Sequence, residues 1–323
     1  MSGPLHVAVD ARDLAHDWRG IARYVRAVLA RFAQRSDVRV TVVERGLFGQ
    51  RAPRDADVVW HPWNGTFFSA RVPSVVTFHD AVPFRFPAAD PRKRRNEQGP
   101  WLRSAATARA FLANSHFTVT EVERFLGVAP ERQTVTYLGV ERDVFAPDGP
   151  AYALPDGRPY VLFVGTLEPF KNLVTLQAAH ARAFPQAETA LVIAGNGPPS
   201  DERVHALGVV EPAVLAGWYR GASAVAVPST YECFGLPLLE AMSCGTPVLA
   251  SRTPSLLEVG GDAVTWVDDP LDVAAWSAAL TRAAEDDAWR ATSRDAGLAR
   301  AATFSWDRCA EETFAVLRRT ANA

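Results

Sequence analysis

The chain has 323 residues, of which 48% are apolar, and its formal net charge is −2. This length can bury two hydrophobic cores, so we expect two domains. The small negative net charge argues against nucleic acid as a partner, since a protein that binds the phosphate backbone usually has an excess of basic residues. The N-terminus lacks a signal-peptide pattern, no apolar run reaches the ~18 residues of a membrane span, and the three cysteines lack metal-ligand spacing. We therefore expect a cytoplasmic protein.

Short apolar runs alternate with helical patterns along the first half of the chain. After the first run, Ile21, Val25 and Phe32 share one face of a predicted helix. A later helix is predicted to begin after Ser115, whose hydroxyl can cap it, and to end at Gly127. The apolar runs predict six strands, at Leu5–Val9, Val38–Val43, Val58–Trp60, Val75–Phe78, Phe111–Ala113 and Val135–Tyr137.

The segment 139–159 is rich in proline and glycine and poor in apolar residues, which indicates a linker. Strands separated by helices predict parallel sheets with right-handed crossovers. The sequence thus indicates an α/β protein with two Rossmann-like domains facing a central cleft, at residues 1–147 and 148–304, and a last helix within 305–323. Ligands of such sheets bind beyond the carboxyl ends of the strands. The second domain is predicted to contain strands at Tyr160–Val164, Ala190–Ala194, Ala224–Val227, Val248–Ala250 and Val264–Val267.

One segment, 229–247, predicts a loop followed by a short helix. Pro237 suits the first helical position, because its missing N–H costs nothing there. Gly245 is expected to end the helix after about two turns. The N–H groups and the dipole at such a helix start favour an anion.

Three residues in this segment suggest what the anion carries. Gly235 lets the ligand approach the backbone closely. Glu232 in the loop and Glu240, predicted on the first helical turn, can accept hydrogen bonds from hydroxyls. A ligand with both phosphates and hydroxyls, such as a sugar nucleotide, fits this combination. Taken singly, a solvated Glu232 and a first-turn Glu240 would require no ligand.

The letters around these glutamates resemble the Glu-x7-Glu signature of retaining GT-B glycosyltransferases of family 4. The match includes the flanking Phe-Gly-Leu-Pro and Gly-Thr-Pro-Val. Five further segments resemble family motifs in the same order and extend across nearly the whole chain. They are Asp10–Arg12 with Gly20–Tyr24, Phe78–Pro83, Ala113–Phe117, Val164–Leu173 and Phe304–Trp306.

The resemblance implies a metal-independent hexosyltransferase that moves a hexose from a nucleoside diphosphate sugar to an acceptor hydroxyl with retention of anomeric configuration. It assigns Lys171 to the donor diphosphate, His79 and Glu232 to the donor sugar, and Glu240 to the ribose. Without the resemblance, Lys171 would be a solvated loop lysine and His79 a strand-end histidine satisfied by backbone groups. The other donor-binding residues that it implies are Gly20, Gly165, Thr166, Val210, Phe234, Gly235 and Leu236.

The resemblance also implies a donor-binding C-terminal domain and an N-terminal acceptor domain, with the helix at 305–323 crossing back to the latter. The Val-Gly-Thr-Leu-Glu-Pro form at 164–169 is frequent among mannosyltransferases, so GDP-mannose is the first donor hypothesis. The acceptor would be a glycan, a lipid-linked sugar or a small molecule such as a natural product.

The chain also departs from the family pattern. Many relatives have an arginine where Thr166 or Phe170 stands, and a second glycine where Ala22 stands. These departures support a second hypothesis, a degenerate, non-catalytic GT-B protein that serves as a partner or regulatory subunit. If the chain is an enzyme, the missing arginine could be replaced by Arg19, Arg23 or Arg252.

Three remaining patterns are weaker. Asp55-Ala56-Asp57 has the spelling that holds a metal in GT-A transferases, but it lies far from the donor motifs, so we predict no metal or other cofactor. The basic run Arg92–Arg95 is expected in a solvated loop, or else against an anionic acceptor or a membrane surface. Trp60, Trp63 and Trp101 could stack on a sugar.

Overall fold

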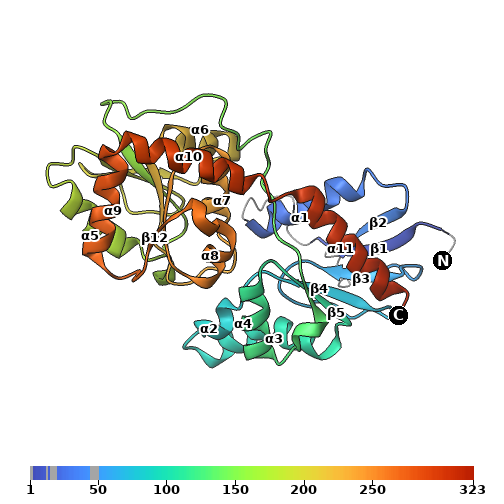
Figure 1. Ribbon diagram of the computed structural model, residues 1–323. Coiled ribbons are helices and arrows are strands. Elements are labelled where there is room, and N and C mark those ends of the chain that lie inside the picture. The colour runs from blue at the N-terminus through green and yellow to red at the C-terminus, as the bar shows by residue number, and fades with distance from the viewer. Residues whose placement is uncertain (1–2, 12–13, 15–19, 44–50) are drawn as a thin grey trace. The chain divides into compact units, whose positions relative to one another are not determined.

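The computed structural model describes residues 3–11, 14, 20–43 and 51–323 (Figure 1). The chain divides into two compact units. Unit 1 combines residues 1–139 with 305–323, and unit 2 is the continuous segment 140–304. Across the described part of the chain, no helix is both long and apolar enough to cross a membrane.

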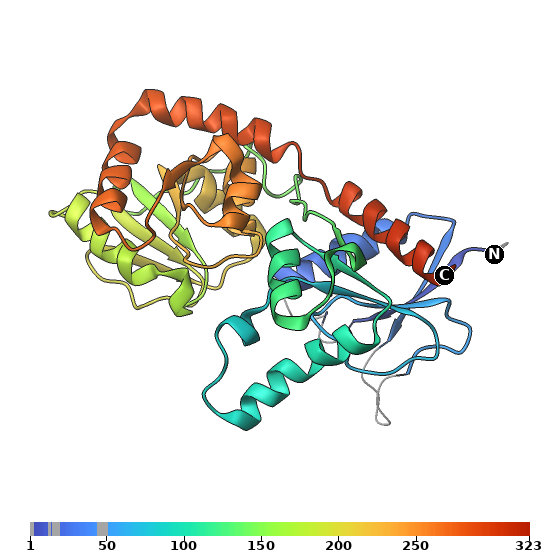
Figure 2. The same cartoon turned by 60° about the horizontal axis from the view of Figure 1, so that its bottom comes forward.

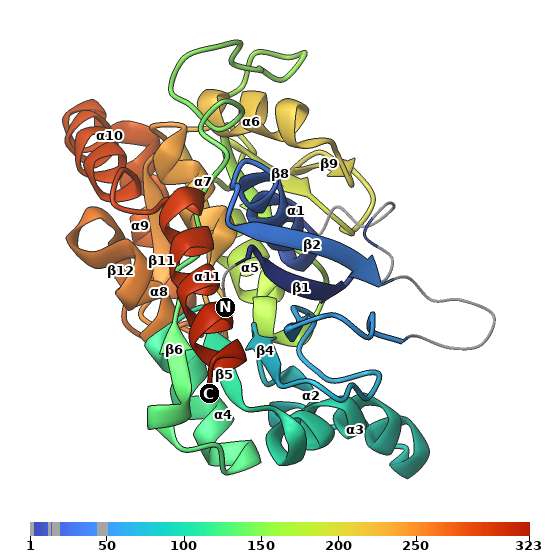
Figure 3. The same ribbon diagram turned by 90° about the vertical axis from the view of Figure 1, so that its right-hand side faces the viewer.

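Unit 1 is built on a parallel sheet whose described strands run in the order β2-β1-β3-β4-β5-β6. Figure 3 shows β1 and β2 side by side, and they pair from Leu5 opposite Val38 to Asp10 opposite Val43. The strands β1 and β3 are buried along their whole length, which is typical of a sheet covered on both faces. The strands are β1 (Leu5–Asp10), β2 (Val38–Val43), β3 (Val58–His61), β4 (Ser74–Phe78), β5 (Ala110–Ala113) and β6 (Gln133–Val135).

The helices of unit 1 begin and end where local sequence signals place them. Ser115 accepts a hydrogen bond from the Thr118 N–H, and Gly127 ends the same helix in the left-handed conformation, as predicted. Two short elements are α2 (Val82–Arg85), between β4 and α3, and the 3-10 turn Pro130–Arg132, between α4 and β6. The longer ones are α1 (Gly20–Phe32), α3 (Pro91–Thr107), α4 (His116–Leu126) and α11 (Trp306–Ala321).

The last helix, α11, packs against α1, β3 and β4 of unit 1 (Figures 1 and 2). Trp306, Phe314 and Leu317 are buried in this contact. The chain approaches itself closely here, since a Cβ on Gly139 would lie 2.2 Å from the Trp306 nitrogen. Residues separated by more than half of the sequence therefore complete one core.

Unit 2 repeats the parallel architecture, with its described strands in the order β12-β11-β10-β7-β8-β9. One apolar core forms where α5 and α9 pack on this sheet, and it contains Leu176, Trp276 and Leu280. Beyond that core, α6 and α7 contact β7, β10 and β11. The strands are β7 (Tyr160–Val164), β8 (Ala190–Ala194), β9 (Val204–Gly208), β10 (Ala224–Val227), β11 (Val248–Ser251) and β12 (Thr265–Val267).

Apart from β8 and β9, which follow each other directly, the strands of unit 2 alternate with helices up to β12, after which two helices follow in succession. Asp272 and Asp286 cap this last pair, each accepting backbone N–H bonds in the first turn. The helices are α5 (Leu173–Ala183), α6 (Pro212–Gly221), α7 (Leu236–Ser243), α8 (Pro254–Gly260), α9 (Val273–Glu285) and α10 (Asp287–Ala301), with 3-10 turns at Pro169–Lys171 and Gly261–Ala263.

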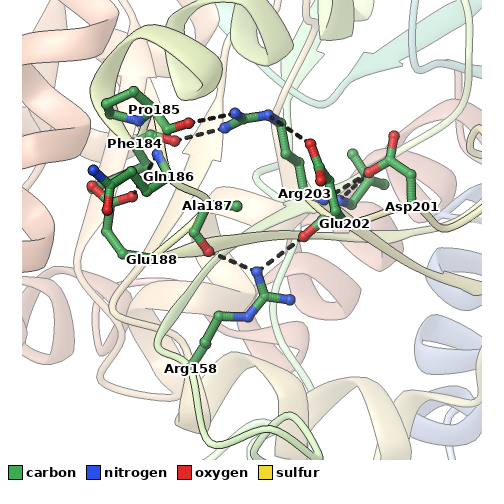
Figure 4. A network of polar contacts seen from close by, with 10 residues as sticks. Arg158, Phe184, Pro185, Gln186, Ala187, Glu188, Asp201, Glu202 and Arg203 are labelled. Carbon is green, nitrogen blue, oxygen red and sulfur yellow. Dashed lines mark hydrogen bonds and ion pairs between the residues drawn. The ribbon is translucent and has the colours of Figure 1, made fainter.

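Two arginines tie loops together at the amino edge of the unit 2 sheet (Figure 4). Arg203 donates to the carbonyl groups of Phe184 and Pro185, both at 2.6 Å. Arg158 donates to the carbonyl of Ala187, also at 2.6 Å. Ligands of parallel sheets bind at the opposite, carboxyl edge. We therefore interpret this arginine network as structural rather than ligand-binding.

The predicted fold class is confirmed by the two parallel sheets with their intervening helices. Three local predictions are wrong. The last strand of unit 1 is Gln133–Val135 rather than Val135–Tyr137, and β9 was not predicted. The basic run Arg92–Arg95 lies on the exposed face of α3 rather than in a loop, because Asp90 caps this helix and Pro91 opens it.

Candidate active site

The segment 229–247 forms the predicted loop and short helix at the carboxyl end of β10. Gly235 precedes α7 with φ of 92°, and a Cβ there would lie 2.5 Å from Leu256, so only glycine fits. The helix begins at Leu236, which makes Pro237 its second residue rather than its first. Glu240 consequently lies on the second turn, and the first-turn placement was wrong.

The start of α7 leaves few backbone donors for a ligand. Pro237 has no N–H, and the N–H groups of Leu238 and Leu239 both donate to the Gly235 carbonyl. A ligand could therefore reach only the N–H groups of Gly235 and Leu236 in this turn. Both residues were predicted to bind the donor, and this geometry is compatible with an anion at the helix start.

Lys171 and Glu232 are in direct contact. The Lys171 Nζ donates to Glu232 Oε1 at 2.5 Å, and the Ser229 hydroxyl donates to the same oxygen at 3.0 Å. The Glu232 carbonyl accepts a further bond from the Ser255 hydroxyl at 2.6 Å. The side chains of Lys171 and Glu232 are 19% and 12% exposed, so the pair is sheltered but open to a ligand.

The backbone around Lys171 is fixed by a left-handed asparagine. Asn172 has φ of 57°, and its side-chain nitrogen donates to the carbonyl groups of Pro228 and Pro270 at 3.0 and 2.7 Å. These bonds join the turn after β7 to the loops after β10 and β12. The position of Lys171 is thus set by contacts among three loops at the carboxyl edge of the sheet.

Glu240 is almost fully buried, with 2% of its surface exposed. The hydroxyl of Tyr219, on α6, donates to Glu240 Oε2 at 2.9 Å. A buried carboxylate needs such donors, because an ionised group without them is costly to remove from water. Phe234, which was predicted to contact the donor, is also buried and packs edge-on against Phe304.

Gly165 and Thr166 follow β7 at the same edge. The Gly165 N–H donates to the Ala194 carbonyl, and a Cβ on Gly195 would lie only 1.9 Å from the Gly165 oxygen. The loops after β7 and β8 therefore touch through their backbones. The Thr166 hydroxyl donates to the carboxylate of Glu168.

Val210 lies half-buried in the connection from β9 to α6, beyond the end of the strand. Phe170 occupies one of the two positions where the family resemblance led us to expect an arginine. Its ring packs edge-on against Tyr231, with 6.0 Å between the ring centroids, and its carbonyl accepts from the Thr230 N–H at 2.8 Å. Lys171 Nζ lies 5.9 Å from the centre of the same ring.

In unit 1, His79 directly follows β4 and is 6% exposed. Its Nε2 lies 2.9 Å from the Pro62 carbonyl, which can only accept, so Nε2 is assigned the proton and Nδ1 is the acceptor. Burial lowers the pKa of His79 to about 4, which keeps the ring neutral. The ring edge also packs on Tyr24, with 4.8 Å between the ring centroids.

A network of amides holds the backbone of His79. The Asn64 side-chain oxygen accepts from the His79 N–H at 2.5 Å, and its nitrogen donates to Asp80 at 2.9 Å. Asn114 donates to the His79 carbonyl at 3.0 Å. Asn64 itself has φ of 61°, a left-handed conformation that asparagine tolerates better than most residues.

The remaining candidates are scattered. Gly20 is the first residue of α1 in unit 1, and Arg23 lies on the same helix. Arg19 and Arg12 lie outside the described residues. Arg252 follows β11 and binds Asp268 at 2.6 Å. The structure thus brings Lys171 and Glu232 together in unit 2, while His79 and Gly20 belong to unit 1.

Other predicted features have structural roles. Asp57 accepts from the His6 N–H at 2.8 Å, and Asp55 accepts from the Arg39 guanidinium at 2.6 Å. Both aspartates of the Asp-x-Asp segment therefore bind other residues of the chain. Within the part of the chain that the structure describes, no cluster of three or more histidine, cysteine or acidic residues could hold a metal. Trp60 is fully buried and donates to Thr77, which contradicts a role in sugar stacking.

Sequence reasoning missed several residues that hold the predicted ones, among them Gly195, Asn172, Ser229 and Tyr219 in unit 2. The segment Gly195-Asn196-Gly197 after a buried strand was a signal for close backbone contact. Ser229 lies three residues before Glu232, a spacing that suits a local hydrogen bond. Tyr219 gave no such signal, because its partner Glu240 lies on another helix.

Solved structures with the same architecture define the fold class. Sucrose-phosphate synthase from Thermosynechococcus elongatus superposes with a TM-score of 0.75 over 98% of each chain, at 20% sequence identity. Two Rossmann-like units of parallel strands and helices make this the GT-B fold.

The sequence comparisons then identify the family. Residues 158–286 match the family described as glycosyl transferases group 1, and residues 50–144 match glycosyltransferase family 4. O-antigen chain mannosyltransferase B from Escherichia coli is 35% identical over 74% of this chain and 68% of its own. A D-inositol 3-phosphate glycosyltransferase from Streptosporangium roseum is 34% identical over 60% of this chain, but only 51% of its own length is matched. The chain belongs to the family 4 glycosyltransferases.

Proposed function

We propose that the protein is a retaining hexosyltransferase that uses a nucleoside diphosphate sugar and no metal ion. The observation that carries this proposal is the Lys171–Glu232 pair beside the start of α7 in a family 4 glycosyltransferase. An ammonium group and two backbone N–H groups suit a diphosphate, while the adjacent carboxylate suits sugar hydroxyls.

In the proposed reaction, the bond between the sugar's anomeric carbon and the diphosphate breaks, and the acceptor oxygen bonds to that carbon on the same face. The acceptor's proton passes to the leaving phosphate oxygen, so no protein nucleophile is needed. Lys171 and the N–H groups of Gly235 and Leu236 would stabilise the charge that grows on the diphosphate. Glu232 would hold a sugar hydroxyl, and Glu240 would hold the ribose.

His79 would contribute from unit 1, which we propose as the acceptor domain. Its neutral ring presents Nδ1 as an acceptor, which suits a hydroxyl of the donor sugar. Unit 2 would hold the donor, with the remaining contacts made by Gly165, Thr166, Val210 and Phe234. Gly20 would complete the donor contacts from the start of α1.

We propose GDP-mannose as the donor. Two observations support this choice, the Val-Gly-Thr-Leu-Glu-Pro segment and the 35% identity with a mannosyltransferase of O-antigen synthesis. The acceptor would then be the hydroxyl of a glycan, a lipid-linked sugar or a natural product. For a lipid-linked acceptor, the exposed basic residues on α3 offer a surface for phosphate groups or for weak membrane contact.

A second candidate is a non-catalytic GT-B subunit. It is supported by Phe170, which replaces an arginine, and by the Arg252–Asp268 contact, which occupies one proposed substitute. The two candidates differ in whether sugar is transferred.

A panel of GDP-, UDP- and dTDP-sugars tests the proposal through thermal stability, because a ligand that binds the native state raises the melting temperature. We expect GDP-mannose to give the largest shift. Transfer to a model acceptor, followed by NMR of the new glycosidic bond, should then show the donor's anomeric configuration. A donor that binds without any transfer would favour the non-catalytic subunit, and an inverted product would refute the retaining mechanism.

A further inference from the structure

Glu240 depends on a neighbour that the family signature does not contain. Only 2% of its surface is exposed, and the Tyr219 hydroxyl donates to its Oε2 at 2.9 Å. Tyr219 is itself completely buried on α6. A charge-assisted hydrogen bond in such an environment is stronger than one in water, because little solvent competes for the carboxylate.

Tyr219 has little freedom to point elsewhere. Its backbone carbonyl accepts from the Thr246 hydroxyl at 2.7 Å. Its ring packs edge-on against Phe145, with 5.9 Å between the ring centroids. Phe145 is fixed in turn, since its carbonyl accepts from the Ser243 hydroxyl at 2.5 Å. The hydroxyl of Tyr219 therefore approaches the carboxylate from one fixed direction.

A carboxylate held at one oxygen has a defined position for the other. With Oε2 bonded to Tyr219, rotation of the Glu240 carboxyl group would break a buried hydrogen bond, which is costly.

We infer that Tyr219 is a positioning residue for ribose recognition, acting through Glu240. The inference rests on the proposed function, in which Glu240 accepts hydrogen bonds from the ribose of the donor nucleotide. In this role Tyr219 acts through the Glu240 carboxylate rather than by contacting the ligand itself. Its effect should therefore appear only with nucleotides that carry ribose hydroxyls.

The experiment compares GDP with 2′,3′-dideoxy-GDP by calorimetry, using UDP and its dideoxy form instead if the UDP-sugars bind better. Tyr219→Phe removes one oxygen and keeps the ring that packs on Phe145. We expect it to raise the Kd for the ribonucleotide roughly tenfold, which corresponds to one lost charge-assisted hydrogen bond. The Kd for the dideoxy nucleotide should stay within about twofold of the wild-type value.

Tyr160→Phe is the matched control. Tyr160 is also buried in unit 2, and its hydroxyl lies 3.0 and 2.8 Å from the carbonyl oxygens of Tyr152 and Trp218. Removing this hydroxyl costs a buried hydrogen bond without touching Glu240. Both nucleotides should bind this variant as they bind the wild type, and melting temperatures show that each variant is folded.

A second variant, Phe145→Leu, keeps the Tyr219 hydroxyl and removes the ring contact that orients it. We expect a smaller loss for the ribonucleotide and none for the dideoxy form. Equal losses for both nucleotides in Tyr219→Phe would show a merely structural role, and no loss would also overturn the inference.

Glu240→Ala separates the inference from the proposed function. If the wild type prefers the ribonucleotide and Glu240→Ala abolishes that preference, the role of Glu240 stands, and Tyr219→Phe alone decides the inference. If the wild type binds none of GDP, UDP and dTDP, the proposed function fails and the inference fails with it.

Discussion

The Lys171 Nζ lies 2.5 Å from Glu232 Oε1, although the two residues are 61 positions apart in the sequence. One follows β7 and the other follows β10, so the parallel sheet brings their loops to the same edge. The pair joins the residue expected to bind phosphate with the residue expected to bind sugar. The contact therefore links the positive charge available to the donor's diphosphate with the carboxylate available to the donor's sugar.

A double-mutant cycle should reveal this coupling in stability. Lys171→Met leaves a sheltered carboxylate without its cation, and Glu232→Gln leaves a sheltered ammonium group without its anion. We expect each to lower the free energy of unfolding by about 1–3 kcal/mol. The double variant should lose less than the sum by about 1 kcal/mol or more, as measured by urea denaturation. Strictly additive losses would show that the contact contributes nothing.

The two glutamates should separate nucleotide binding from turnover. Glu240→Ala should weaken binding of the free nucleotide, because a hydrogen bond between a hydroxyl and a carboxylate contributes roughly 1.5–3 kcal/mol. Glu232→Ala should reduce turnover without weakening nucleotide binding, since it removes a sugar contact and releases Lys171 for the phosphates. Calorimetry with the nucleotide and an assay with the full donor measure the split. An equal loss of nucleotide affinity in both variants would contradict the two roles.

Phe170→Arg should tighten binding of the nucleotide sugar. Lys171 is already partnered by Glu232, so an added guanidinium would supply further positive charge to balance the negative diphosphate. The gain should shrink as salt is raised, because exposed charges are screened. Titration at low and high salt checks both statements, with Phe170→Leu as the control without charge. A loss of turnover with level nucleotide affinity would indicate instead that the ring packs on the sugar.

His79 should make the protein less stable in mild acid. Its folded pKa of about 4 lies below the ordinary value of 6.5, so the unfolded chain binds the proton more readily between these values. Stability is then full above about pH 6.5 and falls as the pH drops towards 4. At about pH 5 this one group should cost about 2 kcal/mol relative to about pH 7.5.

His79→Gln isolates that contribution, because its amide can still donate to the Pro62 carbonyl. Denaturant unfolding of both proteins at the two pH values should show the variant losing less stability than the wild type. His180, whose pKa is also lowered by burial, is present in both proteins and cancels in the comparison. Equal losses would mean that His79 is protonated in the folded state at mildly acidic pH.

Sugar transfer should survive exhaustive chelation. In the proposed site Lys171 and the start of α7 face the charge that a divalent ion balances in GT-A enzymes. Assays with and without EDTA, each repeated after manganese or magnesium is added back, make the test. Activity that disappears with EDTA and returns with the ion would overturn the metal-free mechanism.

The fold was predictable because its strands are short apolar runs bounded by glycine, proline and polar residues. β6 was misplaced because the sequence pattern of Val135–Tyr137 is typical of a strand. In the structure, Gln133–Val135 pair with β5 instead. α3 was missed because the run of arginines after Pro91 was interpreted as a loop, although Asp90 and Pro91 are typical of a helix start. Pro100 also interrupts the helical pattern. In each case tertiary context decided between local alternatives.

The site was predictable where it is carried by contiguous letters, as in Glu232–Glu240. It was not predictable where partners come from separate elements. The contacts of Tyr219 with Glu240 and of Asn64 with His79 depend on which helix or loop lies beside which strand. A single sequence holds no record of those distances.

The return of α11 to unit 1 reverses the order in which the chain can mature during synthesis. Unit 2 is continuous, so all of its residues, 140 to 304, emerge from the ribosome before the last segment of unit 1. Unit 1 must wait for Trp306, Phe314 and Leu317, which cover α1 and its sheet. Since domains fold as units as they emerge, the N-terminal half should remain an open, chaperone-accessible intermediate until α11 has left the ribosome. A nonsense codon near residue 304 would therefore damage the beginning of the protein rather than its end.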